Sequence, residues 1–199
     1  MSLTLAVKPT LVDRVVRNSL ASDIVLVIAG TALTSAAAQL SIPASPVPFT
    51  FQTLAVLLVG ATLGSVRGAL SMALYAFIGA LGLPVFSEAS SGFKVLFGAT
   101  GGYILGFILA SALVGWFAEK QFASNVVKMA ISYVAGTAVI YALGVTWLAY
   151  SVLGGQFFGE NGALALGLFP FLIWDAVKAV IAAGLVPGAW ALVRKVKGE

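Results

Sequence analysis

Two opposite charges lie within an apolar run near the C-terminal end of the sequence. The run is FPFLIWDAVKAVIAAGL, from Phe169 to Leu185, and Asp175 and Lys178 stand in its middle. Three residues apart on a helix, the two side chains share a face and can reach each other. Each charge costs roughly 2.5–3.5 kcal/mol at the centre of a membrane helix on insertion scales, so a compensating interaction is required.

This pair has two interpretations from the residues alone. It can be a structural ion bridge between packed helices, or it can line a polar cavity in which a ligand uses both charges. A carboxylate accepts hydrogen bonds and an ammonium donates them, so the pair matches a small neutral group such as an amide or a urea. Ionisable residues within membrane spans are functional candidates by default, and we therefore favour the second interpretation.

Bond-breaking chemistry is not expected from this composition. The chain contains no Cys and no His, and its seven Asp and Glu residues are scattered. An activated nucleophile and a metal site both need residues of these kinds close together, so we predict no enzyme activity, no metal and no cofactor. The sequence also lacks a G-x-x-x-x-G-K-[ST] phosphate loop, so active transport would need another subunit or an ion gradient.

The stretch SPVPFTFQT (45–53) is a second candidate for ligand contact. Pro46 and Pro48 favour an extended entry into a helix. Gln52 can both donate and accept hydrogen bonds, and Phe49 and Phe51 offer flat apolar surfaces. The alternative is a helix-capping region with aromatic residues at the membrane interface.

The stretch from Gly82 to Phe107 contains a loop rich in Gly and Ser that could close over a pocket. Ser90 is one of its polar candidates, and Lys94 could meet the anionic tail of a ligand or could be a solvated surface residue. Tyr103, at the start of the next helix, and Trp174 are either pocket aromatics or members of the interfacial aromatic belt.

The composition identifies an integral membrane protein. Of the 199 residues, 60% are hydrophobic and 9% are charged, and the mean hydropathy is +1.06. Ordinary soluble domains carry about 25% charged residues. We predict one all-α membrane domain over residues 1–199, in contact with the lipid bilayer. The net charge of +4 is explained by its location and not by nucleic-acid binding.

Six apolar segments are long enough to suggest a six-helix bundle over about residues 24–193. They run approximately Ile24–Ile42, Phe49–Gly64, Ala69–Phe86, Gly101–Ala118, Met129–Leu153 and Leu164–Val193. Residues 1–22 precede them and are expected to form either a helix lying on the membrane surface or a flexible arm.

The basic residues predict the orientation of these segments. With the N-terminus placed inside, the outer side holds Lys94 alone and one span holds Lys178. The remaining nine of the eleven lie on the inner side: Lys8, Arg14, Arg17, Arg67, Lys120, Lys128, Arg194, Lys195 and Lys197. We therefore predict cytoplasmic termini and outward loops at 43–48, 87–100 and 154–162.

Small residues recur at four-residue spacing and suggest close helix contacts. Ala32 and Ala36 share one face of the first segment, which could meet another helix of this chain or of a partner. The glycines at this spacing are interpreted mainly as internal packing positions: Gly60, Gly64 and Gly68; Gly98, Gly102 and Gly106; and Gly184 and Gly188.

Four motifs occur in an order that resembles the BioY family, the biotin-specific S-components of energy-coupling factor (ECF) transporters. They are VPFTFQTLAVLLVGATLG, GLPVFSEASSG, GATGGYILGF and WDAVKAVIA, and the resemblance runs from about Ala29 to Leu185. Ala99 departs from the family's frequent GPTGGY string. The resemblance implies the six-helix S-component fold with an outward vitamin pocket, in a bacterial or archaeal plasma membrane.

The resemblance also implies partners and roles. The partners are a transmembrane coupling subunit and two ATPase subunits, with Ala32 and Ala36 on the docking face. The ligand is biotin, whose ureido N–H groups would donate to Asp175 while its oxygen accepts from Lys178. The assisting residues would be Gln52 and Tyr103, with Lys94 near the carboxylate and Phe49, Phe51 and Trp174 against the rings or tail. An S-component for another vitamin and an ion-coupled carrier working alone are the alternatives.

Overall fold

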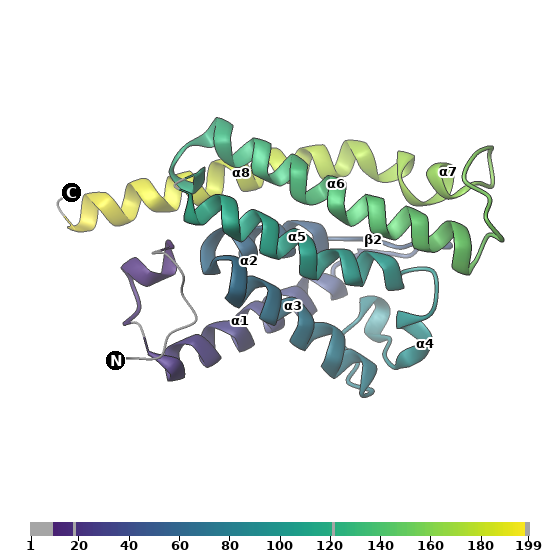
Figure 1. The fold of residues 1–199 in the computed structure, drawn as a ribbon, viewed down its shortest axis with the longest axis horizontal. Coiled ribbons are helices and arrows are strands. Elements are labelled where there is room, and N and C mark those ends of the chain that lie inside the picture. The colour runs from purple at the N-terminus through teal and green to yellow at the C-terminus, as the bar shows by residue number, and fades with distance from the viewer. Residues whose placement is uncertain (1–9, 18, 121, 198–199) are drawn as a thin grey trace.

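The computed structural model describes residues 10–17, 19–120 and 122–197, and the described chain is mainly helical (Figure 1). It contains six helices of twelve or more residues: α1 (Leu20–Gln39), α2 (Gln52–Leu63), α3 (Ser65–Ala80), α5 (Gly101–Glu119), α6 (Val126–Ser151) and α8 (Phe169–Lys197). Each corresponds to one expected apolar segment. The expected all-α class is therefore confirmed as a mainly helical fold.

Within the described part of the chain, four helical stretches are long and apolar enough to cross a membrane: Leu20–Gln39, Gly101–Glu119, Val126–Ser151 and Ala163–Val196. Helices α2 and α3 are apolar but have only 12 and 16 residues. At 1.5 Å per residue they reach about 18 and 24 Å, which is less than the hydrocarbon thickness of about 30 Å. The number of complete spans therefore stays a prediction.

Short elements connect the long helices. They are η1 (Val12–Arg14), β1 (Ser41–Ile42), β2 (Phe49–Thr50), η2 (Ser87–Ala89), α4 (Phe93–Leu96), η3 (Phe122–Ser124) and α7 (Ala163–Gly167). Within the expected N-terminal segment 1–22, the described part contains η1, and residues 1–9, including Lys8, lie outside the described residues. An interfacial position for this segment stays a prediction.

The N-terminal ends of two long helices have side-chain caps. The hydroxyl of Ser19 accepts a hydrogen bond from the backbone of Ser22 at α1, at 3.2 Å. The side-chain oxygen of Asn125 accepts one from Lys128 at α6, at 3.0 Å. Ser and Asn at this position satisfy N–H groups that have no partner inside the helix, so these residues fix where the two helices begin.

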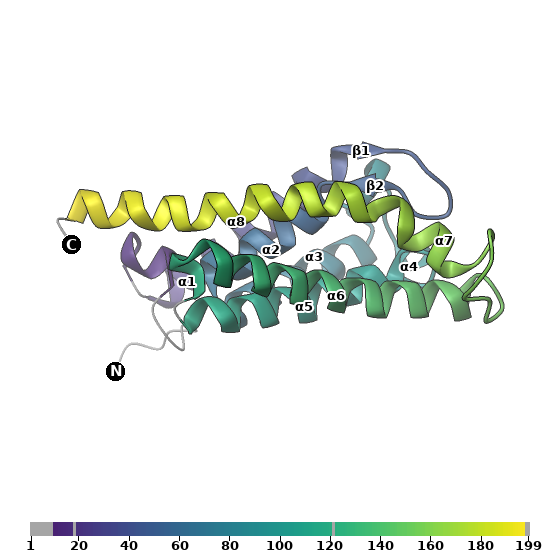
Figure 2. The same cartoon turned by 90° about the horizontal axis from the view of Figure 1, so that it is seen from above.

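Helix α5 lies at the centre of the bundle and packs against α2, α3 and α6. Helix α1 packs on α2 and α3, and α8 packs on α2 and α6. Seen from above, α8 runs along one side of the bundle (Figure 2). The start of α1 and the end of α8 lie at one end of the molecule, and β2, α4 and α7 lie at the other (Figure 1). The three loops predicted to face outward therefore share one end.

The strands β1 and β2 form a small antiparallel hairpin that pairs Ser41 with Thr50 and Ile42 with Phe49. Helix α2 begins at Gln52, directly after this hairpin. The expected span from Phe49 therefore starts with a strand, and this strand delivers Phe49 and Thr50 to the entrance of α2. The expected long final segment is likewise divided, because α7 ends at Gly167 before α8 begins at Phe169.

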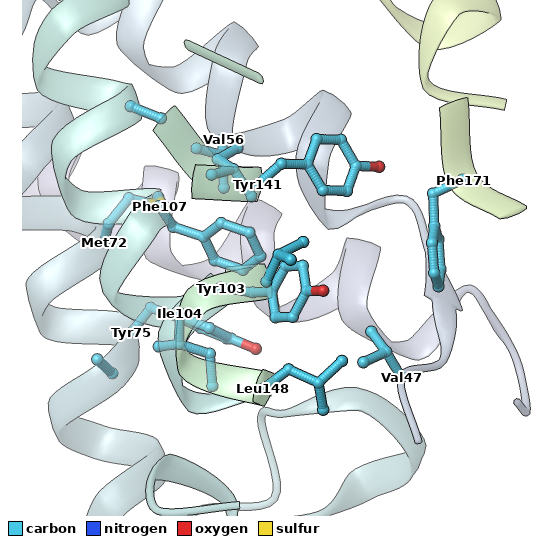
Figure 3. Packing of buried hydrophobic residues seen from close by; sticks show 14 of the residues in the cluster. Val47, Val56, Met72, Tyr75, Tyr103, Ile104, Phe107, Tyr141, Leu148 and Phe171 are labelled. Carbon is cyan, nitrogen blue, oxygen red and sulfur yellow. The ribbon is translucent and has the colours of Figure 1, made fainter. Parts of the chain in front are cut away.

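The larger core cluster places several aromatic side chains between the central helices and the loop end of the molecule (Figure 3). Tyr75, Phe107 and Ile104 lie among the helices, and Tyr103 and Tyr141 lie beside them, with Phe171 on α8 nearby (Figure 3). The rings of Tyr103 and Tyr141 meet edge to face with centroids 6.3 Å apart. Such pairs add stability beyond the area they bury and fix ring orientation.

Glycine allows the central helices to approach closely. A Cβ at Gly60 on α2 would lie 2.5 Å from the carbonyl oxygen of Ser111 on α5, and one at Gly68 would lie 2.6 Å from the Ser111 hydroxyl. A Cβ at Gly106 would lie 2.9 Å from the Cα of Ile140 on α6. The internal packing role is confirmed for these glycines. Gly64 instead joins α2 to α3 with φ +89°.

The glycines of α8 behave differently. A Cβ built at Gly184 or Gly188 would meet no atom of the described chain within 4 Å. The expectation that these two glycines pack internally is therefore wrong. Equal spacing in the sequence did not distinguish a helix face turned toward the bundle from one turned away.

We predict that Gly60→Ala destabilises the fold and that Gly184→Ala does not. The first substitution forces a methyl group against the α5 backbone, and overpacking of this kind costs about 1–3 kcal/mol. The second adds a methyl group in open space and replaces glycine with a better helix former. Thermal unfolding of both variants in detergent measures the difference, and equal melting temperatures would show that α2 and α5 are less tightly apposed than described here.

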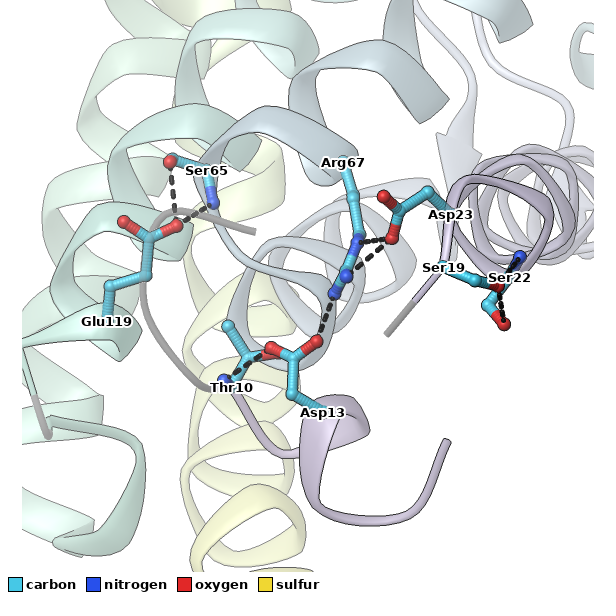
Figure 4. Close-up of polar contacts among 8 residues, drawn as sticks. All are labelled: Thr10, Asp13, Ser19, Ser22, Asp23, Ser65, Arg67 and Glu119. Atoms are coloured by element: carbon cyan, nitrogen blue, oxygen red, sulfur yellow. Dashed lines mark hydrogen bonds and ion pairs between the residues drawn. The ribbon is translucent and has the colours of Figure 1, made fainter. Parts of the chain in front are cut away.

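A buried ion cluster fastens the end of the bundle opposite the hairpin (Figure 4). The Arg67 side chain on α3 is 1% exposed. Its Nε donates to Oδ1 of Asp23 on α1 and its Nη1 donates to Oδ1 of Asp13, both at 2.7 Å. Asp13 also accepts from the Thr10 backbone at 2.7 Å and the Thr10 hydroxyl at 2.8 Å. The cluster thus ties the N-terminal segment to α1 and α3.

A third carboxylate, that of Glu119, lies nearby at the start of α3 (Figure 4). Oε1 of Glu119, the last residue of α5, accepts from the backbone N and the hydroxyl of Ser65, both at 2.7 Å. A negative charge at a helix N-terminus satisfies free N–H groups and interacts favourably with the helix dipole. The junction between α2 and α3 is therefore fixed from α5.

We predict that Arg67→Ala lowers the free energy of unfolding by about 3–5 kcal/mol, because removing one partner leaves a buried charge uncompensated. Arg17, which is exposed at the same end, provides the matched control, and Arg17→Ala should change stability by less than about 0.5 kcal/mol. Denaturant titration of both variants compares them. Similar unfolding of the two would indicate that Asp13 and Asp23 do not depend on Arg67.

Candidate functional site

The predicted charge pair lies on α8, where Asp175 is buried and Lys178 is half-buried. Nζ of Lys178 lies 2.8 Å from Oδ1 of Asp175, one helical turn away. The side chains are 12% and 6% exposed, respectively. The two charges therefore form an ion pair shielded from the surroundings, as their spacing predicted.

Three other segments contact the pair. The Thr53 hydroxyl on α2 donates to Oδ1 of Asp175 at 3.1 Å, and the Tyr141 hydroxyl on α6 donates to Oδ2 at 2.6 Å. Nζ of Lys178 donates to the backbone oxygen of Thr50 on β2 at 2.6 Å and approaches the Thr53 hydroxyl at 3.3 Å. These contacts compensate the burial of both charges and join α8 to α2, α6 and the hairpin.

A small cavity of about 50 Å³ is lined from the hairpin side by Thr50, whose backbone oxygen accepts from Lys178, but neither charge of the pair lines it. Its polar lining includes Gln52 and Tyr103, two of the predicted site residues. Nε2 of Gln52 donates to the Tyr75 hydroxyl at 2.7 Å, and its Oε1 accepts from the Thr50 hydroxyl at 3.0 Å. The Tyr103 hydroxyl donates to the backbone oxygen of Gly167 at 2.7 Å. Both predicted residues are thus buried and held in place.

A wider groove of about 470 Å³ lies between the hairpin, the end of α1 and α8. Its lining includes the predicted residues Phe49, Phe51, Trp174 and Lys178. Nζ of Lys178 lies 5.6 Å from the centre of the Phe51 ring, within reach of a cation–π contact. Thr50 lines both the cavity and the groove. The predicted site residues therefore divide between two hollows that share one wall.

Two predicted residues lie apart from these hollows. The Ser90 hydroxyl donates to the backbone oxygen of Ser87 at 2.6 Å, inside its own loop. Lys94 is exposed on α4. Neither residue lines the cavity or the groove, so the structure does not bring them to the charge pair.

The α1 face that carries Ala32 and Ala36 points away from the rest of the chain. Both alanines are exposed, whereas Thr31 and Thr34 on the other face are buried. The Thr31 hydroxyl donates to the backbone oxygen of Ser71 on α3 at 2.9 Å. The alanine pair therefore does not serve internal packing, and a partner-docking role for it stays a prediction.

Sequence reasoning missed Tyr141 and Thr53 as direct neighbours of Asp175. Thr53 belongs to the SPVPFTFQT stretch, in which Gln52, Phe49 and Phe51 are the candidates for ligand contact. Tyr141 carried a usable signal, because a tyrosine deep within an apolar helix needs a partner for its hydroxyl. Its distance in sequence from Asp175 hid which partner that was. Among the described residues, no group of three Asp or Glu side chains could hold a metal ion.

Comparison with known proteins decides the family. The BioY family model matches residues 8–195. The chain belongs to the BioY family. This confirms the resemblance that the four sequence motifs suggested.

Curated relatives of this BioY-family chain are named as transporters. "Biotin transporter BioY" of Thermotoga maritima is 42% identical over 153 residues, which cover 77% of this chain and 86% of the relative. "Probable biotin transporter BioY" of Pyrococcus horikoshii is 41% identical over 162 residues, which cover 81% and 92%. The relatives are transporters and not enzymes, as we predicted for this chain. Such relatives, together with several apolar helices, indicate a multi-pass membrane protein.

A solved structure shares the fold of this chain. The crystal structure of the S-component for biotin from an ECF-type ABC transporter superposes with a TM-score of 0.73. It covers 90% of this chain and 92% of its own, at 22% sequence identity. The expected S-component architecture is therefore confirmed at the level of the fold.

We predict that Tyr141→Phe destabilises the protein and that Tyr133→Phe does not. Loss of the Tyr141 hydroxyl leaves Oδ2 of Asp175 without its donor, which costs about 1–3 kcal/mol for a buried group. The Tyr133 hydroxyl on the same helix is buried without a hydrogen-bond partner among the described residues, so its removal should be neutral or slightly stabilising. Thermal unfolding separates the two, and a larger loss for Tyr133→Phe would contradict the described contacts.

Proposed function

We propose that this chain is the biotin-binding S-component of an ECF vitamin uptake transporter. Its membership of the BioY family, the names of its curated relatives and the S-component fold support biotin as the ligand. The observation that carries the proposal is the buried Asp175–Lys178 pair. It offers one acceptor group and one donor group in the N-terminal half of α8. Lys178 lines the apolar groove, and its partner Thr50 lines both the groove and the small cavity.

The ureido head of biotin would bind at this pair. Its N–H groups would donate to Asp175 in place of Thr53 or Tyr141, and its oxygen would accept from Lys178 in place of the Thr50 carbonyl. Exchanging one hydrogen bond for another contributes little net free energy. The head group would therefore supply specificity, whereas burial of the rings and the aliphatic tail would supply most of the affinity.

The two hollows suggest how the ligand is accommodated. Pockets for small ligands typically measure about 300–1,000 Å³. The groove of about 470 Å³ falls in this range and the cavity of about 50 Å³ does not. We infer that Phe49, Phe51 and Trp174 contact the rings or the tail from the groove side. Gln52 and Tyr103 would assist the head from the cavity side, once the neighbouring loops move outward.

The carboxylate end of biotin would then extend toward the loops at this end of the molecule. Lys94 is the cation among these loops, and Ser90 lies in the same connection. Their present distance from the charge pair means that contact with the carboxylate would require the segment around α4 to close over the ligand. Lys94→Ala should therefore weaken binding less than substitutions at the charge pair.

The membrane arrangement completes the proposal. The termini would be cytoplasmic and the hairpin end would face outward, so biotin would be captured from outside the cell. The sequence contains no phosphate loop. ATP would be used by two ATPase subunits that act through a transmembrane coupling subunit, and the exposed Ala32 and Ala36 would dock to that coupling subunit. The host membrane would be the plasma membrane of a bacterium or an archaeon.

The charge pair can be tested by titration calorimetry of the purified protein with biotin. Asp175→Asn and Lys178→Ala should each weaken binding by about 1–3 kcal/mol or more, which is roughly 5- to 150-fold. The matched control is Glu160→Gln, because Glu160 is exposed in the loop between α6 and α7. This control should bind biotin like the parent.

Three outcomes would contradict the proposal. Folded variants at both positions that bind biotin like the parent would remove the charge pair from the site. A parent protein that does not respond to micromolar biotin, but is stabilised by another vitamin, would identify a different S-component. Uptake into liposomes driven by a proton or Na⁺ gradient, without ATPase subunits, would instead indicate an ion-coupled carrier.

A further inference from the structure

Gln39, the last residue of α1, lines the groove and also contacts the loop between α3 and α4. Its side-chain Nε2 lies 3.0 Å from the backbone oxygen of Phe86 and 3.4 Å from that of Val85. Its Oε1 accepts a hydrogen bond from the backbone N of Ala89 at 3.0 Å. One exposed side chain thus contacts both ends of the turn that contains η2, across a sequence distance of about fifty residues.

The held loop forms part of the cavity wall. Phe86 and Ser87 line the cavity, and Phe86 is 1% exposed. The Phe86 ring meets the ring of Tyr75 edge to face, with centroids 5.3 Å apart. The Tyr75 hydroxyl in turn accepts from Gln52. Outward movement of this turn would withdraw Phe86 and open the cavity toward the loop end of the molecule.

The turn has a backbone conformation that favours release. Glu88 and Ala89 both adopt positive φ, +58° and +52°. The left-handed region is disfavoured for residues with a Cβ, and such residues persist where the surrounding contacts hold them. Ala89 is one of the two residues in this conformation, and its backbone N–H is the group that donates to Oε1 of Gln39. The hydrogen bond from Gln39 therefore holds the turn at one of its two residues with positive φ.

We propose that Gln39 is a positioning residue that keeps residues 85–90 closed over the ligand cavity and so sets the rates at which ligand enters and leaves. This rests on the proposed function, because the cavity is the one from which Gln52 and Tyr103 are proposed to assist the biotin head group. Gln39 does not touch the charge pair in any described contact. Its effect would pass through Phe86 and Ser87, which it holds in the wall.

Gln39 lies on the same exposed face of α1 as Ala32 and Ala36. The spacing is four residues from Ala32 to Ala36 and three from Ala36 to Gln39, which places all three along one side of the helix. All three are exposed. A molecule laid along this face of α1 would therefore reach the side chain that restrains the turn.

The test compares Gln39→Ala with the parent in two measurements. Hydrogen exchange of residues 85–90, measured without biotin, should become faster. Association and dissociation of biotin, measured by stopped flow, should both accelerate by about 2- to 12-fold, the factor expected for one lost hydrogen bond. Gln39 also lines the groove, and a lost contact there would raise the dissociation constant without speeding association. Faster association is therefore the result that reports release of the turn.

The matched control is Gln156→Ala, since the Gln156 amide is exposed and contacts the Phe158 oxygen within its own loop, at 3.4 Å. A second variant, Gln39→Glu, keeps an acceptor for the Ala89 amide and loses the donor to Phe86 and Val85. It should show a smaller increase in exchange and rates. It also provides the test if Gln39→Ala does not fold.

If both Gln39 variants match Gln156→Ala in exchange and in both rates, Gln39 does not restrain the turn and the inference is wrong. That outcome leaves the proposed function standing, provided that the parent binds biotin. If the parent does not bind biotin, the proposed function fails, and the exchange measurement still decides whether Gln39 holds the turn.

Discussion

Burying charge in an apolar bundle constrains both ends of this molecule. An unpaired charge in such surroundings is costly, so each buried charge must meet a partner from another segment. Near the hairpin, Asp175 and Lys178 draw α2, α6 and β2 toward α8. At the opposite end, Arg67 draws α1 and the N-terminal segment toward α3. Close packing at glycines joins the helices between these two clusters.

The two interpretations of the Asp175–Lys178 pair are compatible with each other. The pair does bridge packed helices, because its partners come from three other segments. Each of those partners is a hydroxyl or a backbone carbonyl, and such groups can be exchanged for the polar groups of a ligand at little net cost. A buried network of this type can fasten the bundle and still offer a binding site, provided that the ligand satisfies the same atoms. Its structural and recognition roles therefore depend on the same hydrogen bonds.

The sequence predicted the features that depend on neighbours along the chain. The Asp175–Lys178 contact followed from three-residue spacing on a helix, and the helix positions followed from apolar segments. Gln52 and Tyr103 were expected at the site and do line the cavity. Contacts across the fold were harder to predict. Hydropathy placed Arg67 among the inner cations, but it did not reveal the pairing with Asp13 and Asp23, which are 54 and 44 residues away.

Local motifs also did not predict which way a helix face or a side chain points in the fold. The Gly184–Gly188 spacing resembles that of the packed glycines, yet the two α8 glycines face open space, because the side of a helix that meets the bundle is set by tertiary packing. Lys94 was considered as a ligand for an anion on the basis of charge alone. Its side chain is exposed on α4, whereas the neighbouring Val95 lines the cavity. Which of the two faces the cavity depends on how the loop between α3 and α5 folds. Residue type and spacing could not supply that information.

One contact of the charge pair has a consequence for how this protein tolerates mutation. The shortest hydrogen bond of Lys178 goes to a backbone oxygen, that of Thr50. Replacing the side chain at position 50 would remove its contact with Gln52 and leave this bond in place. A scan of single substitutions would therefore undercount the importance of the hairpin to the lysine. The hairpin could accumulate side-chain changes over evolution while still holding the ammonium, as long as its strand pairing is kept.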